Sequence, residues 1–413
     1  MKVLVVARLF SGLAESLAQR RWQPSGVPAI HKLIEGLADA KDVQTELAFL
    51  VRDADARFAR AERVPLPPLN LEAQLLPWRG NWPNWANELS QAWAVIKLVR
   101  RLRPDVVYAT NAGFIGAALV SRLGLAPVVL RFLGIFPAQK RMTERRTGLA
   151  RWFYRAPFAH AVCTLDGSGP EHYLPRLLRK DVKLSILLNG VDRRDVGAEA
   201  ARALRGKLRL DARPVVMFLG RLEKYKGADE FVEALAALEK IRPGAFQGLI
   251  VGDGPLTPSL SARLNACGLA GRVAMTDAVR HDQVPDYLAA GDIYVSLNRY
   301  GGLSNANLEA LAAGRCTLML AGDPADHTDS ATDRLLPADI VERLPRDNTQ
   351  AALAARLAEL LDRPAEIAAR AARTLDFART HLDTWPARIA KEIDIIRAAA
   401  RREPSLATTG IAS

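Results

Sequence analysis

The chain has 413 residues, of which 49% are hydrophobic and 25% charged, and these ordinary globular values exclude a disordered or fibrous protein. At roughly 100 to 200 residues per domain, the length predicts two or three domains. The net charge of +12 arises entirely in residues 1–188, which contain 27 Lys and Arg against 15 Asp and Glu, because the remaining residues contain 30 of each.

The first half alternates short β-branched runs with helical patterns. Strands are expected at residues 2–6, 45–50, 106–109 and 128–130. A helix is expected through apolar residues at helical spacing, namely Trp85, Leu89, Trp93, Ile96 and Val99, and Pro104 should end it. Such alternation predicts an α/β domain built on a parallel, doubly wound sheet.

The second half starts the same alternation afresh, which predicts a second Rossmann-like domain. Strands are expected at residues 214–219, 249–251 and 293–296, and helices at 229–238, 256–266 and 303–313. The predicted organisation is an N-terminal domain at 1–188, a second domain at 189–375, C-terminal helices at 376–402 that pack back on the first domain, and a disordered tail at 403–413.

Three cysteines are too few and too scattered for a disulfide framework or a zinc cluster, which favours a reducing, cytoplasmic compartment. No apolar run reaches the roughly 18 residues of a membrane-spanning helix. The first apolar run is interrupted at Arg8, too early for a signal peptide.

A basic loop follows the strand at 214–219 and contains Gly220, Arg221 and Lys226. These cations and the N–H groups of the next helix would suit a diphosphate. A solvated face is the better interpretation of the cations alone, but ligands bind at the carboxyl ends of strands in doubly wound sheets, which favours the functional interpretation here.

Two further glycine-containing turns follow predicted strands. The turn at residues 252–255 fits a plain structural turn and a ligand contact about equally well. At Gly301 and Gly302, backbone is able to approach a ligand, and Glu309 lies about two turns further along an otherwise apolar helix. A buried carboxylate needs a partner, and a ribose diol would supply one.

Taken together, five ordered motifs resemble those of the family 4 retaining glycosyltransferases, which have the GT-B architecture of two facing Rossmann-like domains. The motifs are NGVD at 189–192, GRL…KG at 220–227, VGDGP at 251–255, AGDIYV at 290–295 and LEALAAG at 308–314. The resemblance covers most of the chain and is strongest over residues 189–320. No single motif is specific, but five in order are.

The resemblance implies a nucleoside diphosphate sugar donor held mostly by the second domain, with no metal and no cofactor. Arg221 and Lys226 would be the catalytic cations that neutralise the departing diphosphate, and Glu309 would bind the ribose. The loop at residues 302–305 would present N–H groups to the phosphates and sugar. The other donor-binding residues implied are Gly26, Gly220, Val279, Gly302, Leu303, Ser304 and Asn305.

Two positions depart from the family pattern. Gly301 stands where the family usually has a glutamate near the donor sugar, and Leu133 stands where it tends to have a histidine. Neither departure touches the phosphate clasp, but both concern the handling of the sugar and the acceptor. Candidate substitutes on that side are Asn111, Arg131 and Asn298.

The other polar residues carry weaker signals. The six histidines lack metal-ligand spacing and are expected to be structural or exposed, and the acidic stretch at residues 323–333 is expected to be a solvated loop. Basic patches at 97–103 and 140–155, the second with interleaved aromatics, favour an anionic membrane surface over simple solvation, and no nucleic-acid partner is expected.

The sequence therefore predicts a retaining, metal-independent glycosyltransferase. It would transfer a sugar to a hydroxyl of a cell-envelope or exopolysaccharide precursor, either a sugar or a lipid-linked acceptor, and would be cytoplasmic or peripheral on the inner face of the membrane. Two alternatives remain: a catalytically silent nucleotide-sugar binding protein, suggested by Gly301 and Leu133, and a sugar-nucleotide epimerase of similar architecture.

Overall fold

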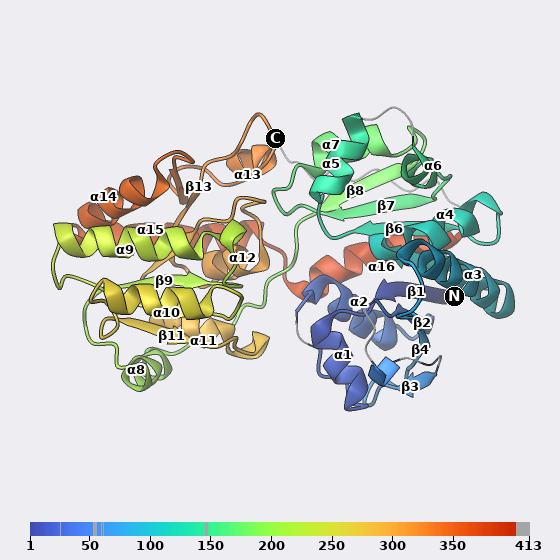
Figure 1. Cartoon of the computed structure of the whole chain (residues 1–413), viewed down its shortest axis with the longest axis horizontal. Helices are drawn as coiled ribbons and strands as arrows, with labels where there is room; N and C mark the ends of the chain where they lie inside the picture. Colours follow the sequence, from blue (N-terminus) through green and yellow to red (C-terminus); the bar gives the residue numbers. More distant parts are fainter. Residues whose placement is uncertain (25, 53–55, 59, 61, 145–147, 402–413) are drawn as a thin grey trace. The chain divides into compact units, whose positions relative to one another are not determined.

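A computed structural model describes residues 1–24, 26–52, 56–58, 60, 62–144 and 148–401 (Figure 1). The chain divides into two compact units. Unit 1 contains residues 1–165, 170–188 and 385–413, and unit 2 contains residues 166–169 and 189–384. The expected tail at 403–413 lies outside the described residues.

Unit 1 is built on an eight-stranded sheet of order β3-β4-β2-β1-β5-β6-β7-β8, in which only the pairing of β3 with β4 is antiparallel. The strands are β1 (Lys2–Arg8), β2 (Gln44–Leu50), β3 (Arg63–Pro65), β4 (Glu72–Leu76), β5 (Val106–Thr110), β6 (Val128–Phe132), β7 (His160–Thr164) and β8 (Lys183–Leu187). The helices are α1 (Ser11–Ala18), α2 (Pro28–Asp39), α3 (Asn84–Leu102), α4 (Phe114–Arg122), α5 (Pro137–Glu144), α6 (Leu149–Tyr154), α7 (Pro170–Leu177) and α16 (Trp385–Arg401).

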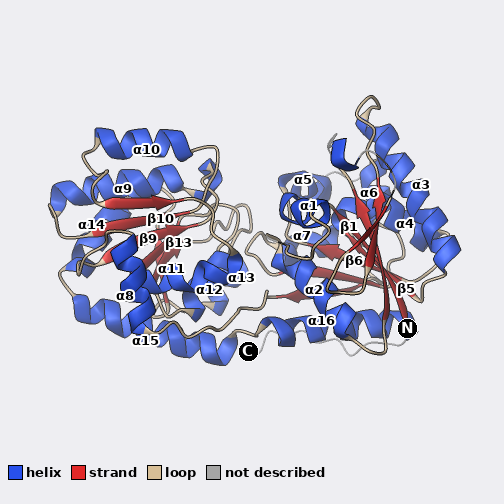
Figure 2. Ribbon diagram, turned by 90° about the horizontal axis from the view of Figure 1, so that it is seen from below, coloured by secondary structure: helices blue, strands red, loops and turns tan. Residues whose placement is uncertain are grey.

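Helices bury both faces of this sheet, as buried parallel strands require. Residues of α3, α4, α6 and α7 pack on one face, and residues of α1, α2 and α16 pack on the other (Figure 2). Helix α16 therefore completes the core of unit 1 from the far end of the chain. The expected domain end at residue 375 falls inside helix α15 (Pro364–His381), which runs without a break, so unit 2 extends to Thr384.

Unit 2 contains a six-stranded parallel sheet of order β11-β10-β9-β12-β13-β14. The strands are β9 (Val215–Leu219), β10 (Gln247–Val251), β11 (Val273–Thr276), β12 (Ile293–Ser296), β13 (Cys316–Leu320) and β14 (Val341–Leu344). The remaining helices are α8 (Ala198–Lys207), α9 (Ala228–Ile241), α10 (Thr257–Ala266), α11 (Val284–Ala290), α12 (Asn305–Ala312), α13 (Ser330–Leu335) and α14 (Thr349–Leu361). Residues of α9, α10 and α14 cover one face, and residues of α8, α11 and α12 cover the other. The predicted pair of Rossmann-like sheets is confirmed.

Helix α3 forms where the apolar spacing predicts it, and Arg103 ends it in a left-handed conformation just before Pro104. Its C-terminal half is buried at Ile96 and Val99. Trp85, Leu89 and Trp93, however, have exposed fractions of 67%, 50% and 51%. Helical spacing identified the helix, but part of its apolar side faces solvent.

Candidate donor site in unit 2

The chain of unit 2 reverses direction across its sheet between β9 and β12. From β9 it proceeds to β10 and β11 on one side, and it then returns to β12 beside β9 and continues to β13 and β14. Ligands of open α/β sheets bind beyond the carboxyl ends of the strands at this kind of reversal. The loops after β9 and β12 contain the residues that the sequence singled out.

The loop after β9 brings Arg221 and Lys226 together with one carboxylate. Arg221 has an exposed guanidinium that forms an ion pair with Glu223 at 2.6 Å. Burial lowers the pKa of Lys226, while the carboxylates of Asp166 and Glu223 oppose that shift. Two cations of different exposure therefore lie in one loop at the sheet reversal.

Gly227 allows this loop to lie against the strand that precedes the next loop. Its φ is +74°, and a Cβ added there would lie 2.4 Å from the Leu297 Cβ. The ring of Tyr225 stacks on that of Tyr300 with centroids 5.0 Å apart, and Arg299 N donates to Tyr225 O at 2.9 Å. The two loops thus hold one another in place.

The glycine loop after β12 differs from the expectation at two of its N–H groups. Gly302 N donates to Asp329 Oδ1 at 2.5 Å, and Leu303 N donates to Asp166 O at 3.1 Å. These two groups serve the internal structure of unit 2 and are not presented to a ligand. Ser304 occupies the N-cap position of α12 without a side-chain capping hydrogen bond, and Asn305 begins the first turn of that helix.

Glu309 in the second turn of α12 is almost buried and takes part in a chain of charged groups. His281 Nδ1 lies 3.5 Å from Glu309 Oε1, and His281 Nε2 lies 3.2 Å from Asp192 Oδ2. Burial raises the pKa of Glu309 to about 7, with His281 opposing and Asp192 adding to the rise. The carboxyl group that the sequence assigned to ribose therefore has a pKa near neutral pH.

The affinity for nucleoside diphosphates is expected to rise between about pH 6 and about pH 8, because ionised Glu309 accepts hydrogen bonds from ribose hydroxyls more strongly than its protonated form. Glu309→Gln should weaken binding at the higher pH by up to about tenfold and should remove this part of the pH dependence. Calorimetry with the original protein and the variant across this pH range measures the difference in nucleotide affinity. Protonation of the nucleotide itself affects both proteins equally and therefore cancels. If the affinity of the variant depends on pH in the same way as that of the original protein, Glu309 has only a structural role.

The turn at residues 252–255 has the structural role that was one of its two interpretations. A Cβ at Gly252 would lie 1.9 Å from Gly220 O, and one at Gly254 would lie 2.5 Å from Leu222 O. The glycines therefore let this turn pack directly on the β9 loop. The predicted donor-binding residue Val279 is half-buried and packs among the apolar side chains of α11 and its neighbours.

Arg131 was expected on the acceptor or sugar side, and the structure contradicts this. Its side chain is fully buried in unit 1, where Nε lies 2.9 Å from Glu392 Oε1 of α16 and Nη2 donates to Thr164 Oγ1 at 2.9 Å. A guanidinium that is buried and paired in the core of unit 1 is not available to a substrate.

The other weak candidates have mixed outcomes. Asn298 is buried, and its amide donates to Gly301 O at 2.5 Å and accepts from Tyr300 N at 3.3 Å, so it shapes the glycine loop. Asn111 is half-buried at the end of β5 and accepts from Tyr154 OH at 2.8 Å. Gly26 is exposed with a φ of +67° and belongs to unit 1, so its approach to a donor stays a prediction.

Sequence reasoning missed the residues that surround the expected ones. His281, one of the histidines expected to be structural or exposed, contacts Glu309, and sequence reasoning did not predict this contact. Asp329 was placed in a solvated loop, yet it is 2% exposed and supports Gly302. Asp166 belongs to no motif. A residue in a motif that could have indicated the position of His281 is Asp192 of NGVD, which His281 also contacts.

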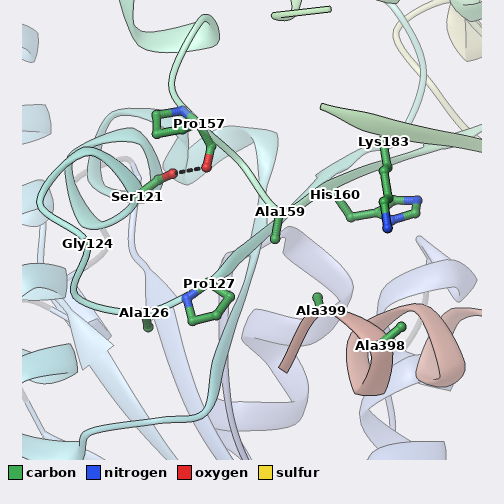
Figure 3. A pocket seen from close by; sticks show the side chains of 10 residues that line it. All are labelled: Ser121, Gly124, Ala126, Pro127, Pro157, Ala159, His160, Lys183, Ala398 and Ala399. Carbon is green, nitrogen blue, oxygen red and sulfur yellow. Dashed lines mark hydrogen bonds between the residues drawn. The ribbon is translucent and has the colours of Figure 1, made fainter. Parts of the chain in front are cut away.

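A cavity of about 430 Å³ lies in unit 1 (Figure 3). It is lined mostly by small apolar side chains, and its charged or titratable residues are His160 and Lys183, which begin β7 and β8. It therefore opens at the amino ends of the strands, opposite to the edge where ligands bind in such sheets. Within the described residues, no His, Cys, Asp and Glu group fits a metal ion, and every helix is too short or too polar to span a bilayer.

Comparisons with known proteins define the class. Residues 213–363 match the model of the glycosyl transferases group 1 family. Alpha-D-kanosaminyltransferase of Streptomyces kanamyceticus is 31% identical over 268 residues, which are 60% of this chain and 68% of that protein. The 2-deoxystreptamine N-acetyl-D-glucosaminyltransferase of Streptomyces fradiae is 32% identical over 299 residues, 67% of this chain and 68% of that protein.

Among solved structures, Anabaena Alr3699/HepE in complex with UDP and glucose superposes with a TM-score of 0.69 at 17% identity, covering 95% of this chain and 98% of that one. The fold is thus GT-B, and the protein is a glycosyltransferase that uses a nucleotide sugar. The chain belongs to the glycosyl transferases group 1 family, the retaining family 4 glycosyltransferases, as its motifs indicated.

Proposed function

We propose that unit 2 binds the nucleoside diphosphate sugar at the carboxyl ends of β9 and β12, with the diphosphate at Arg221 and Lys226 and the ribose at Glu309. The observation that carries this proposal is the convergence of both cations, the N-terminus of α12 and a nearly buried carboxylate at the sheet reversal. The opposed charges at the two ends of the site match the nucleotide, with cations for its phosphates and an acceptor for its hydroxyls.

The chemistry rests on stabilising the leaving diphosphate. As the bond between the sugar and the phosphate breaks, negative charge grows on the phosphate oxygens, and Arg221 and Lys226 neutralise it. The acceptor hydroxyl attacks the same face of the sugar that the diphosphate leaves, and its proton passes to the departing phosphate. This route retains the configuration at the sugar carbon.

A thermal-shift screen followed by calorimetry with UDP, GDP, ADP and dTDP tests the donor assignment, since a ligand of the native state raises the melting temperature. UDP is the first choice because the structurally similar Alr3699/HepE of Anabaena was solved in complex with UDP and glucose. At least one nucleoside diphosphate should stabilise the protein, and Lys226→Ala should reduce that shift. Stabilisation by none of the four would contradict the proposal.

The acceptor is proposed to be a cell-envelope or exopolysaccharide precursor on a lipid carrier, reached at an anionic membrane surface. Support comes from the tryptophan face of unit 1, which we define as Trp82, Trp85, Leu89 and Trp93. Exposed tryptophans favour membrane interfaces. Cationic side chains lie over two of these tryptophans, with Arg79 4.3 Å from the ring centroid of Trp82 and Lys97 5.7 Å from that of Trp93. Residues 145–147 of the patch expected at 140–155 lie outside the described residues.

Vesicle co-sedimentation tests the membrane proposal. The protein should bind phosphatidylcholine vesicles that contain phosphatidylglycerol, should ignore pure phosphatidylcholine, and should detach as salt shortens the Debye length from about 8 Å towards about 3 Å. The double variant Trp85→Ala with Trp93→Ala should lose most of this binding. The matched control is Ile241→Ala, which removes an exposed apolar side chain from unit 2. Equal loss in both would remove the tryptophan face from the account.

A soluble aminocyclitol is the second candidate acceptor, favoured by the similarity to the 2-deoxystreptamine N-acetyl-D-glucosaminyltransferase. Such an acceptor carries protonated amines near neutral pH, and the excess positive charge of residues 1–188 would repel it. Transfer assays with 2-deoxystreptamine and with a lipid-linked sugar distinguish the two acceptors directly.

A further inference from the structure

A four-residue segment from the first half of the chain, Asp166–Gly169, belongs to unit 2. It follows β7 of unit 1 and contacts both the glycine loop and Asp329, which supports that loop. Asp166 O accepts from Leu303 N at 3.1 Å, and Gly167 O accepts from Asp329 N at 2.7 Å. The segment is therefore part of the framework of the candidate donor site.

Two glycines, Gly301 and Gly167, allow the backbones of the segment and the loop to pack directly against each other. A Cβ at Gly301, where φ is +141°, would lie 2.2 Å from Asp166 O. A Cβ at Gly167, where φ is +91°, would lie 2.1 Å from Asp329 Oδ1 and 2.7 Å from Gly302 N. No side chain fits at position 301, so a carboxylate beside this part of the loop can come only from another segment.

Asp166 supplies that carboxylate. Its Oδ1 accepts from Ser168 N at 2.9 Å and from Ser168 Oγ at 2.5 Å, whereas its Oδ2 accepts no hydrogen bond from the residues that the structure describes. The charge of Asp166 acts on Lys226, whose pKa it raises against the effect of burial. Burial, together with the nearby Asp329, raises the pKa of Asp166 itself to about 6. Asp166 thus offers a spare acceptor oxygen beside the lysine and the glycine loop.

We propose that Asp166 binds hydroxyl groups of the donor's sugar and so orients and selects the sugar, an inference that rests on the proposed donor site. The sugar is bonded to the outer phosphate. The backbone of Asp166 bonds to Leu303 of the glycine loop and its carboxylate acts electrostatically on Lys226, so Asp166 belongs to the phosphate end of the proposed site, where the ring hydroxyls would lie. A carboxylate accepts from hydroxyls strongly, and a sugar that lacks the matching hydroxyl leaves this oxygen without a partner. Donor selectivity then depends on a residue outside every motif of unit 2.

Paired titrations of the full-length protein separate the sugar from the nucleotide. Calorimetry with UDP and UDP-glucose, and with GDP and GDP-mannose, gives for each pair the ratio of the two dissociation constants, which is the contribution of the sugar. Asp166→Asn should leave the affinity for the nucleoside diphosphate within about threefold and should reduce the sugar's contribution by about tenfold. An unchanged ratio, whether both affinities stay the same or fall equally, would overturn the proposal.

Two control variants distinguish sugar binding from support of the loop. Ser168→Ala keeps the carboxylate and removes the hydrogen bond that Ser168 Oγ donates to it, so its ratio should match that of the original protein. Asp362→Asn makes the same charge change at an exposed ion pair with Arg242, between the ends of α9 and α14, and should change nothing. If Ser168→Ala reproduces the loss, Asp166 only braces the loop and the proposal fails. Failure of the original protein to bind any of these nucleotides, or ADP or dTDP, would contradict the donor site itself.

Discussion

Replacing Lys226 by alanine is expected to lower turnover at least tenfold while the fold stays intact, and Arg221→Ala is expected to do the same. Each variant removes charge-assisted hydrogen bonds of about 1.5 to 3 kcal/mol from a leaving group whose charge is growing. Lys226 should have the larger effect, because it is the more buried of the two and Arg221 is screened by solvent. Steady-state rates with a saturating donor measure this loss.

The matched control is Lys224→Ala, which removes an exposed lysine from the same short helix, η3 (Lys224–Lys226). It should leave turnover nearly unchanged, because Lys224 is not among the residues of the proposed clasp. Melting temperatures of the three variants should agree with that of the original protein. Near-normal activity in both Arg221→Ala and Lys226→Ala would remove the phosphate clasp from the account.

Replacing Glu392 by alanine is expected to destabilise unit 1 by about 3 to 5 kcal/mol, the range for breaking a buried ion pair. Glu392 is fully buried and lies 2.9 Å from Arg131 Nε and 2.7 Å from Arg388 Nη1, and Tyr108 OH donates to it. Although burial opposes ionisation, the two guanidinium groups hold the pKa of this carboxyl below its usual value. The variant leaves two buried cations without their shared partner.

Urea unfolding followed by tryptophan fluorescence measures this effect in unit 1 alone, because all seven tryptophans of the chain belong to that unit. The control is Asp42→Ala, which breaks the exposed pair with Arg397 at 2.8 Å on the same helix, α16. Solvent screens an exposed pair, so its midpoint should move little. Equal shifts in the two variants would mean that the buried cluster is not a main link between α16 and the sheet.

The low pKa of Glu392 also gives a direction for acid unfolding. A group whose pKa is lower in the folded state contributes stability at neutral pH, and that contribution is lost as pH falls through the folded value.

Much of the fold was predictable because buried parallel strands are short, nearly continuous apolar runs. β1, β9 and β10 have this character, and the alternation with helices indicated two sheets. The expected strands did not include β3, β4, β7, β8, β11, β13 and β14. β3 and β14 are short edge strands, and an edge strand with polar residues resembles a loop. The exposed tryptophans of α3 show that spacing identifies a helix without stating which apolar residues face the core.

The candidate site was predictable where its residues are close in sequence. Arg221, Lys226 and Glu309 belong to compact motifs at strand ends, and the structure places them at the sheet reversal. Asp166 was missed because its contact with the glycine loop joins segments far apart in the chain. Arg131 was misassigned for the same reason, because its partner Glu392 lies near the other end of the chain.

The most direct test of the donor site is a crystal structure of the protein with the nucleoside diphosphate that stabilises it most. We expect phosphate oxygens within hydrogen-bond distance of Arg221 and Lys226, with the ribose hydroxyls at Glu309. Nucleotide bound elsewhere, for example in the cavity beside His160 and Lys183 of unit 1, with Arg221 and Lys226 free of phosphate, would contradict it.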